Sequence, residues 1–330
     1  MNNYDLQRRL SIERSYLLKE TDDSHFITVN DIRKALEKEG IFVNRKTIYY
    51  DLHVLEASGL DIIPEGATRN RSYHVGQRDF EDPEIRFLID CIQSSNFIPI
   101  EKSKVLIDKL MNFTNRYFQK MVTKYIFINN RVKSETSWCY INVDVITRAT
   151  ENNHPVRFKY FRYNEKKEKV LGHNGDDYLV SPLFLVVSEQ NYYMVGHSHL
   201  DNEIRHYRID RMQNVTEAVD LRREGKDHLS EHEMETYANR VFCMFNGEET
   251  IVRCRFHNSL SCPVLDRFGL DLILVPDGLE HFIFTTGIKI SPQFYAWMLS
   301  YGDKAEILGP PAARDGIKEL LRTASGVYSG

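Results

Sequence analysis

The chain has 330 residues, of which 42% are hydrophobic and 27% charged, the composition of a folded protein with more than one hydrophobic core. It has no run of about 18 apolar residues and no apolar segment of a signal peptide at its start, so we expect a cytoplasmic protein that does not contact a membrane. The five cysteines are scattered without a C-x-x-C pair, which favours reduced thiols. Because the formal net charge is -4, any surface for nucleic acid must gather its positive charge locally.

Residues 1–78 have the pattern of three helices followed by a β-hairpin. Apolar side chains recur along one side of a first helix, at Leu6, Leu10 and Leu17. Thr28 is placed to cap a second helix, with Asp31 three residues later as in a capping box. Gly40 is placed to end this second helix, because glycine tolerates the left-handed conformation.

The third predicted helix begins after Asn44, whose side chain is suited to an N-cap. Ile48, Leu52 and Leu55 recur at helical spacing and should face the core. Polar, cationic and aromatic side chains remain for the outer face, as on a recognition helix that enters the major groove of DNA. The residues of this segment that we predict to contact DNA are Asn44, Arg45, Lys46, Thr47, Tyr49, Tyr50 and His53.

Two short strand-like segments, residues 60–63 and 72–75, follow the third helix. The turn-rich tip between them carries Arg69 and Arg71, which we also predict to contact DNA. Such a hairpin is typical of the wing of a winged helix-turn-helix, whose arginines lie on the DNA backbone or in the minor groove. The alternative is a small helical bundle with an ordinary charged surface. The order of three helices, an arginine-bearing hairpin and a separate β-rich region favours DNA binding.

The predicted secondary structure changes several times along the rest of the chain. Residues 79–133 have a mostly helical period and are expected to form a helical connector. From Trp138 to about Asp220 the sequence alternates Val, Tyr, Phe and Ile, which predicts strands. A charged, weakly apolar stretch then precedes a final part that mixes strands and helices. The apolar stripes expected in the connector are Leu88, Ile92, Leu106, Leu110 and Phe113.

Several of these segments resemble one protein family. Residues 43–52, with the sequence VNRKTIYYDL, resemble the recognition segment of WYL-domain transcriptional regulators. The family usually has Ser at the cap and Arg before the Asp, where this chain has Asn44 and Tyr50. Segments 155–160, 181–186, 191–197 and 205–212 are similar to strands of the WYL domain, the last being the closing strand. The three positions that give the domain its name fall on Tyr192, Tyr193 and Met194.

The resemblance implies an α+β multidomain fold. It implies a winged helix-turn-helix DNA-binding domain (1–78), a helical connector (79–133), an Sm-like small β-barrel that is the WYL ligand-sensing domain (134–222), a linker (223–248) and a ferredoxin-like α+β dimerisation domain called WCX (249–330). The ligand that it implies for the WYL domain is a nucleotide, a single-stranded nucleic-acid fragment or a similar anion.

Arginine next to tyrosine can hold a phosphate and stack a base, which is the chemistry such a ligand needs. Along a strand, Arg205 and Arg208 should point to opposite faces. The alternative is structural: the tyrosines belong to the barrel core, and Arg211 pairs with a carboxylate such as Asp210 or Asp144. The residues predicted to bind the ligand are Tyr160, Tyr193, His197, Arg205, Arg208 and Arg211.

One stretch has the spacing of metal ligands. His197, His199 and Asp201 alternate, so all three could share a strand face and hold zinc. A predicted turn at this point and the absence of a nearby cysteine in the sequence argue against it. We therefore predict no metal and no cofactor, and assign His197 to the ligand pocket.

These observations together predict a homodimeric, ligand-responsive, sequence-specific transcriptional regulator whose partner is a double-stranded DNA operator. The alternative is a WYL nucleic-acid-binding accessory protein for single-stranded DNA or RNA, associated with an immunity system. The sequence has no nucleophile elbow, P-loop or H-E-x-x-H motif, so we do not expect an enzyme.

Overall fold

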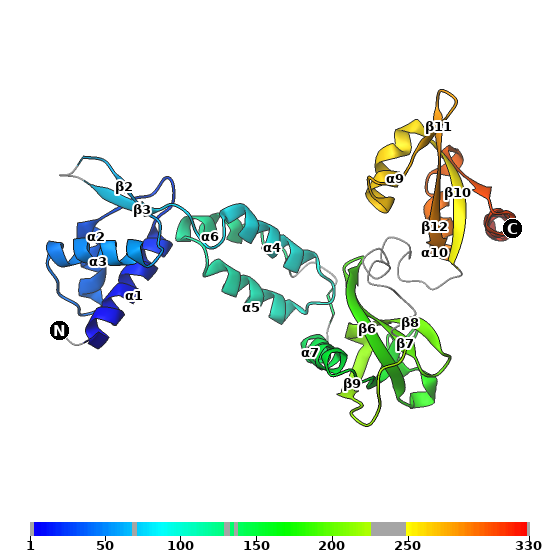
Figure 1. Cartoon of the computed structure of the whole chain (residues 1–330), viewed down its shortest axis with the longest axis horizontal. Helices are drawn as coiled ribbons and strands as arrows, with labels where there is room; N and C mark the ends of the chain where they lie inside the picture. The colour runs from blue at the N-terminus through cyan, green and yellow to red at the C-terminus, as the bar shows by residue number, and fades with distance from the viewer. Residues whose placement is uncertain (1–2, 68–70, 129–132, 135–137, 226–248, 329–330) are drawn as a thin grey trace. The chain divides into compact units, whose positions relative to one another are not determined.

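The structure is a computed structural model that describes the chain apart from residues 1–2, 68–70, 129–132, 135–137, 226–248 and 329–330 (Figure 1). It divides into two compact units, Met1–Ser137 and Trp138–Gly330. Arg69 of the predicted wing and most of the predicted linker lie outside the described residues. Within the described ranges, every helix falls short of the length and apolarity that a membrane span needs.

The first unit begins with three helices and a small antiparallel sheet. The apolar side chains of all three helices and the sheet share one core, in which Leu17, Ile48 and Leu52 are buried. The sheet has the strand order β1-β3-β2, and β2 and β3 form the hairpin. Three helices followed by a β-hairpin is the order that the sequence analysis predicts for a winged helix. The elements are α1 (Asn3–Glu20), β1 (Ile27–Thr28), α2 (Val29–Lys38), α3 (Arg45–Ala57), β2 (Ile62–Glu65) and β3 (Ser72–Val75).

The predicted helix boundaries of this part are confirmed by their caps. The Thr28 side chain accepts the N–H of Asp31, and the Asp31 carboxylate accepts the N–H of Thr28, so the capping box is present. Gly40 follows α2 with a φ of +76°, the left-handed conformation expected there. Asn44 caps α3 by accepting the N–H of Thr47 at 3.0 Å.

Three further helices complete the first unit: α4 (Asp82–Ser94), α5 (Ile100–Met111) and α6 (Arg116–Thr123). α6 packs against α1, where Arg116 forms an ion pair with Glu20 at 2.7 Å. Just after α1, the ring of His25 stacks on that of Tyr117. The winged helix and the three helices that follow it are therefore joined by side-chain contacts as well as by the chain.

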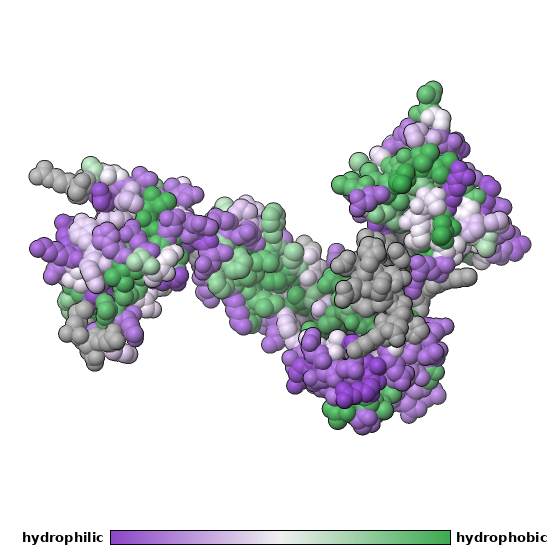
Figure 2. Space-filling view, viewed as in Figure 1, coloured by the Kyte–Doolittle hydropathy of each residue, from purple (hydrophilic) through white to green (hydrophobic). Residues whose placement is uncertain are grey.

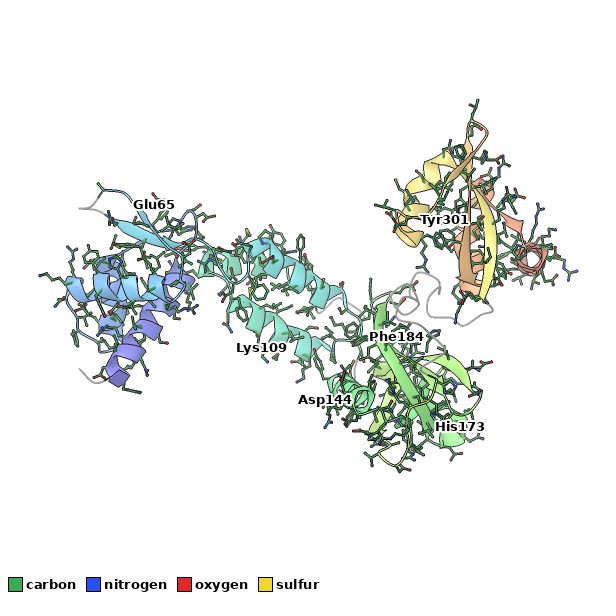
Figure 3. The ribbon with its side chains drawn as sticks, viewed as in Figure 1. Glu65, Lys109, Asp144, His173, Phe184 and Tyr301 are labelled. Atoms are coloured by element: carbon green, nitrogen blue, oxygen red, sulfur yellow. The ribbon has the colours of Figure 1, made fainter. Side chains whose placement is uncertain are left out.

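The apolar stripes predicted for these helices are only in part buried. The core is formed by Ile85, Ile89, Ile107 and Met111. Ile92 and Leu110 of the predicted stripes are half-buried against this core, whereas Phe113 is 49% exposed. Each helix carries two apolar stripes, and the helical period alone does not say which one is buried. Most of the predicted stripe lines a shallow groove of about 310 Å³ beside Lys109 of α5 (Figure 3). Hydrophobic side chains gather over α4 and α5 in the space-filling view (Figure 2). The lining residues from the predicted stripe are Leu88, Ile92, Leu106 and Leu110.

The second unit opens with a helix where strands were predicted. Residues 138–151 form α7 (Trp138–Glu151), which buries Cys139, Asn142, Ile146 and Ala149. These positions are three or four apart, the spacing of one helix face, although β-branched and aromatic residues dominate the segment. Packing against the sheet that follows, above all against β9, overrides the strand propensity.

The sheet of the second unit is antiparallel and curled into a half-barrel. Its strand order is β5-β4-β6-β7-β8, and β9 pairs with β4 at Val156 to Tyr160. Among the strands that the structure describes, β8 and β9 do not pair, so the ring predicted as a small barrel stays open on that side. The strands are β4 (Val156–Tyr163), β5 (Lys169–Leu171), β6 (Tyr178–Ser188), β7 (Asn191–Ser198), β8 (Glu203–Arg208) and β9 (Met212–Glu217).

The predicted closing strand over residues 205–212 is confirmed only as far as Arg208. β8 ends at Arg208, the 3₁₀-helix η3 covers Ile209–Arg211, and β9 begins at Met212. The amide of Asn142 on α7 donates to the carbonyl oxygens of Ile209 (3.2 Å) and Met212 (2.9 Å), which satisfies the carbonyls at this break. Strand alternation therefore does not extend to Arg211.

The C-terminal part is a four-stranded antiparallel sheet with helices. Its chain order is β-α-β-β-α-β and its strand order is β11-β12-β10-β13, which is the ferredoxin-like arrangement that was predicted. Phe256, Phe284 and Phe294 are buried in this core. The elements are β10 (Glu249–His257), α9 (Ser261–Phe268), β11 (Val275–Asp277), β12 (His281–Lys289), α10 (Pro292–Leu299), β13 (Ala305–Gly309) and α11 (Pro311–Tyr328).

Candidate nucleic-acid and ligand sites

The outer face of α3 is a polar, cationic and aromatic surface. Ile48, Leu52 and Leu55 face the core as predicted, and the remaining side chains point outward. Tyr50 is 64% exposed and Tyr49 is 40% exposed. The first turn of α3 has no acidic residue, so its N–H groups and its cations present positive charge together. The exposed residues of this surface are Arg45, Lys46, Tyr49, Tyr50 and His53.

Two of the residues predicted to contact DNA also start the helix. The Asn44 side-chain oxygen accepts both the N–H of Thr47 (3.0 Å) and its hydroxyl (3.2 Å). The cap therefore engages the oxygen of Asn44 and the hydroxyl proton of Thr47. The amide nitrogen of Asn44 is the group that it can offer to a base or a phosphate.

Arg71 lies directly before β3 and is exposed. Burial raises the pKa of Tyr73, as does the nearby Tyr49 of α3, and the charge and hydrogen bond of Arg71 oppose that rise. The base of the hairpin and α3 thus meet at Tyr73. Arg71 joins the cationic surface of α3, whereas Arg69 lies outside the described residues.

A buried ion pair that was not predicted from the sequence holds α3 against α1. Arg9 of α1 forms a two-bonded ion pair with Asp51 of α3, with N–O distances of 2.6 and 2.9 Å. Both side chains are buried, at 3% and 0% exposure. Glu13 lies one turn further along α1 and is also buried. Burial, then the charge of Asp51, raises the pKa of Glu13 to about 8, while Arg9 opposes the rise.

The spacing of these residues along α1 could have indicated that they are buried. Arg9, Glu13 and Leu17 lie four residues apart, so they share the face of α1 that contacts the core. Polar residues on a core stripe are usually assigned to the surface, which is why Leu6 and Leu10 were chosen as the inner face. Both leucines are only half-buried.

The sheet of the second unit brings together four of the six residues predicted to bind a ligand. Tyr193 of β7 is directly opposite Arg208 of β8. The hydroxyl of Tyr160 accepts the backbone N–H of Arg208 at 3.1 Å. Burial raises the pKa of both tyrosines, and the charges of Arg208 and Arg211 oppose the rise in each. Tyr160, Tyr193, Arg208 and Arg211 therefore form one cluster, which we call the Arg/Tyr cluster.

The two arginines of the Arg/Tyr cluster differ in their partners. Arg208 is neutralised by Asp210 through two hydrogen bonds of 3.1 and 2.8 Å. Asp144, the other carboxylate considered for Arg211, pairs with Arg148 on α7 (Figure 3). Within the part of the chain that is described, the Arg211 side chain makes neither an ion pair nor a hydrogen bond. Neither Asp210 nor Asp144, the carboxylates considered for Arg211, therefore pairs with it.

Arg205 and His197 lie outside the Arg/Tyr cluster. Arg205 is opposite Gly196 and pairs with Asp201, on the turn before β8, and with Glu203, the first residue of β8. His197 is 2% exposed, and its Nε2 donates to the side-chain oxygen of Asn202 at 2.9 Å. The predicted pocket of six residues is thus divided between two places on the sheet.

Glu224, His199 and Ser181 form a row of polar side chains close to His197. Nε2 of His199 is 2.8 Å from the hydroxyl of Ser181, and its Nδ1 is 3.7 Å from the Glu224 carboxylate. The three residue types are those of a hydrolytic triad. However, Ser181 is fully buried, and its hydroxyl accepts the N–H of Glu224 at 2.9 Å. A nucleophile in this position has no access to a substrate.

Comparison with protein families places two domains on the chain. The family model of the WYL domain matches residues 142–217, and that of the WCX domain matches residues 248–325. The chain therefore contains a WYL domain and, after it, a WCX domain, as its sequence motifs indicated. The WYL match covers α7 from Asn142 to the end of β9, which includes the whole Arg/Tyr cluster.

Known structures resemble the chain only remotely. Proteasome accessory factor B/C (PafBC) of Arthrobacter aurescens is 15% identical over 99% of this chain and 49% of that one, with a TM-score of 0.30. The chain thus spans about half of that protein's length. A CRISPR Cas-related protein is 16% identical over 98% of this chain and 85% of the other, with a TM-score of 0.37. None of the curated proteins matches the chain by sequence.

Proposed function

We propose that this protein is a DNA-binding transcriptional regulator that acts as a homodimer and responds to an anionic ligand in its WYL domain. The observation that carries the proposal is the exposed surface of α3, where Arg45 and Lys46 stand at a helix start that has no acidic residue. Such a helix start attracts phosphate, and the aromatic and polar side chains further along α3 suit base edges.

The way α3 is held also supports a role in docking. A recognition helix must keep its register in the groove, and α3 is fixed at its start by the Asn44 cap and at its middle by Arg9. Tyr50 replaces an arginine that is usual in the family, so we expect the protein to neutralise one phosphate fewer at this position.

The ligand part of the proposal rests on the Arg/Tyr cluster. Arg208 is already neutralised by Asp210, whereas Arg211 lies beside two tyrosines without such a partner in the described chain. An arginine of this kind binds a phosphate or carboxylate in two-bonded geometry, and a tyrosine ring stacks on a base. A nucleotide or a short single-stranded fragment offers both groups.

In the homodimer, two copies of α3 bind half-sites of a pseudo-palindrome. Their spacing is about one helical turn, roughly 10–10.5 base pairs, or a multiple of it. We assign the dimer contact to the WCX domain. We propose no catalytic role, and the enclosed hydroxyl of Ser181 in the one triad-like row described above is in keeping with this.

The test selects binding sites from random duplexes with the full-length protein and measures affinity by fluorescence anisotropy over a range of salt concentrations. Changing Arg45 and Lys46 together to Gln should weaken binding, and the slope of log affinity against log salt should fall by about 0.9 for each phosphate that the variant no longer neutralises. The control changes Lys166 and Lys167 to Gln, which removes the same charge from an exposed turn of the second unit.

If duplex affinity survives the α3 change, while affinity for single strands depends on Arg208 and Arg211, the protein is a single-strand binder and the regulator proposal fails. If the protein binds neither duplex DNA nor single-stranded DNA or RNA, both functions are rejected.

A further inference from the structure

We propose that the WYL domain of this protein binds a zinc-type divalent metal ion through His197, His199 and Glu224. Among the residues that the structure describes, this is the one group of His, Cys, Asp and Glu side chains so arranged that each offers a ligand atom within 4.8 Å of the others. The proposal is independent of the proposed function in DNA binding.

The strand geometry places the two histidines on one face. His197 lies in β7, and the ladder to β6 continues past its end through the hydrogen bond from the N–H of His199 to the carbonyl of Leu179 (3.1 Å). Residues two apart on a strand share a face. The sequence pattern suggested Asp201 as a third ligand, but Asp201 pairs with Arg205 on the turn.

The third ligand comes from a segment 25 residues further along the chain, counting from His199 to Glu224. This segment is fastened to the sheet beside the histidines. The N–H of Glu224 donates to the hydroxyl of Ser181 at 2.9 Å, and the guanidinium of Arg223 donates to the carbonyl of Pro182 at 2.7 Å. Gly225 has a φ of +74°, and a Cβ at this position would lie 2.5 Å from the Cγ of His197. The backbone therefore passes directly over the His197 ring.

The outer hydrogen bonds of the histidines suit metal binding. Nε2 of His197 donates to the Asn202 oxygen at 2.9 Å, and Nε2 of His199 is 2.8 Å from the Ser181 hydroxyl. Metal-binding histidines usually donate their second ring N–H to such an oxygen, which fixes the tautomer and orients the ring. The metal would then be bound through Nδ1, and it is Nδ1 of His199 that faces Glu224.

The donor set defines the class of ion. Two imidazoles and one carboxylate are ligands of zinc sites that keep a fourth position for water or an added anion. With bonds of about 2.0–2.1 Å, tetrahedral geometry brings donors to roughly 3.3 Å from one another. The Glu224 side chain is 63% exposed, so it is able to move the required distance inward. Metal binding would fasten residues 223–225 to the sheet. These residues lie between the WYL match and the WCX match.

The experiment uses the full-length protein, freed of metal with a chelator and titrated with Zn²⁺ in competition with a chromogenic indicator. We expect one tight site per chain. Glu224→Gln should weaken Zn²⁺ binding by at least about tenfold, because even the loss of a residue that only hydrogen-bonds to a metal ligand has an effect of this size. His199→Ala should abolish the tight site. Asn202→Ala should weaken binding by about 10–100-fold without removing a ligand.

A matched control removes another pair of neighbouring histidines. His257 and His281, whose ring centroids are 5.5 Å apart in the WCX domain, should be replaceable by Ala without changing the affinity or the stoichiometry. Binding of Co²⁺ gives a second signal, because its visible absorption reports the ligand set and should change in Glu224→Gln. Zn²⁺ should also slow hydrogen exchange of the Glu224 amide.

Each outcome decides the proposal. Absence of stoichiometric binding at micromolar Zn²⁺ would overturn it. Equal binding by the wild type and Glu224→Gln would also overturn it, because the ion would then be held elsewhere. Should His199→Ala fail to fold, Glu224→Gln still decides, since its exposed side chain is not part of a core.

Discussion

The Arg9–Asp51 ion pair is the residue-scale feature on which the position of α3 depends most directly. Both partners are buried, and two hydrogen bonds join them. A buried pair of charges contributes little net stability compared with apolar residues, but breaking one half leaves an uncompensated charge. The pair therefore acts mainly by fixing which face of α3 points outward.

Asp51→Asn should destabilise the winged helix by about 3–5 kcal/mol, because it leaves the Arg9 charge buried without its counterion. The measurement is hydrogen exchange of the α3 amides in the full-length protein. Glu56→Gln is the control, since it breaks only the exposed contact with His53 on the same helix. Changing Arg9 to Met and Asp51 to Leu together should restore most of the stability. If the α3 amides exchange at the same rate in Asp51→Asn and in Glu56→Gln, the Arg9–Asp51 pair does not hold the helix.

Glu13 gives this part of the fold a pH dependence. Burial raises its pKa from 4.5 to about 8 in the folded protein. Between these two pH values the folded state holds a proton that the unfolded state has lost, so stability falls as the pH rises through this window, by at most about 1.4 kcal/mol per pH unit. Glu13→Gln should remove this loss. At matched pH, the amides of α1 and α3 should exchange faster in the wild type than in the variant, and this difference should be larger at pH 8 than at pH 5. A constant difference would contradict the assignment.

At the scale of elements, α7 and η3 set the shape of the Arg/Tyr cluster. The chain leaves β8 at Arg208 and turns through η3, which places Arg211 beside Tyr160 and Tyr193. Asn142 of α7 satisfies the two carbonyls at this turn. Phe184 on β6 contributes to the apolar packing around Val195 on the same sheet (Figure 3).

Asn142→Ala should loosen the η3 turn, because it leaves two carbonyl groups without their donor at a cost of about 1–3 kcal/mol. Amides of residues 209–213 should exchange faster in the variant. Thr147→Ala is the matched control, since it removes an exposed hydroxyl that bonds only within the same helix. Equal exchange in the two variants would mean that α7 does not support the turn.

At the scale of the whole molecule, the prediction concerns communication between the WYL domain and the winged helix. A ligand shifts DNA affinity only if it binds one state of the protein better than another. Nucleoside phosphates and short single-stranded oligonucleotides, tested one by one, should include a ligand that changes duplex affinity by about 5–150-fold. Arg211→Gln should lose this response but keep the DNA affinity of the ligand-free protein. Arg148→Gln, on the exposed side of α7, should respond like the wild type. A ligand that binds at Arg211 without changing DNA affinity would contradict the coupling.

Local chemistry made the helix caps predictable from the sequence. Thr28, Gly40 and Asn44 act through hydrogen bonds and backbone conformation within a few residues, so their patterns are visible in the chain. The connector was harder to predict, because both stripes of α4 and α5 are apolar and only packing decides which one is buried. The segment that became α7 shows the same limit, since its strand propensity gave way to contacts with the sheet.

The sequence by itself determined the domain content of this protein and the outward face of α3, because both follow from motifs and from periodicity along one segment. Tertiary structure alone decided which charges meet. It joined Arg9 to Asp51 across 42 residues, separated Arg205 from Arg211, and replaced Asp201 with Glu224 beside the two histidines. Ion pairs and metal sites depend on distances in space, and those distances are set by how the elements pack rather than by their order in the chain.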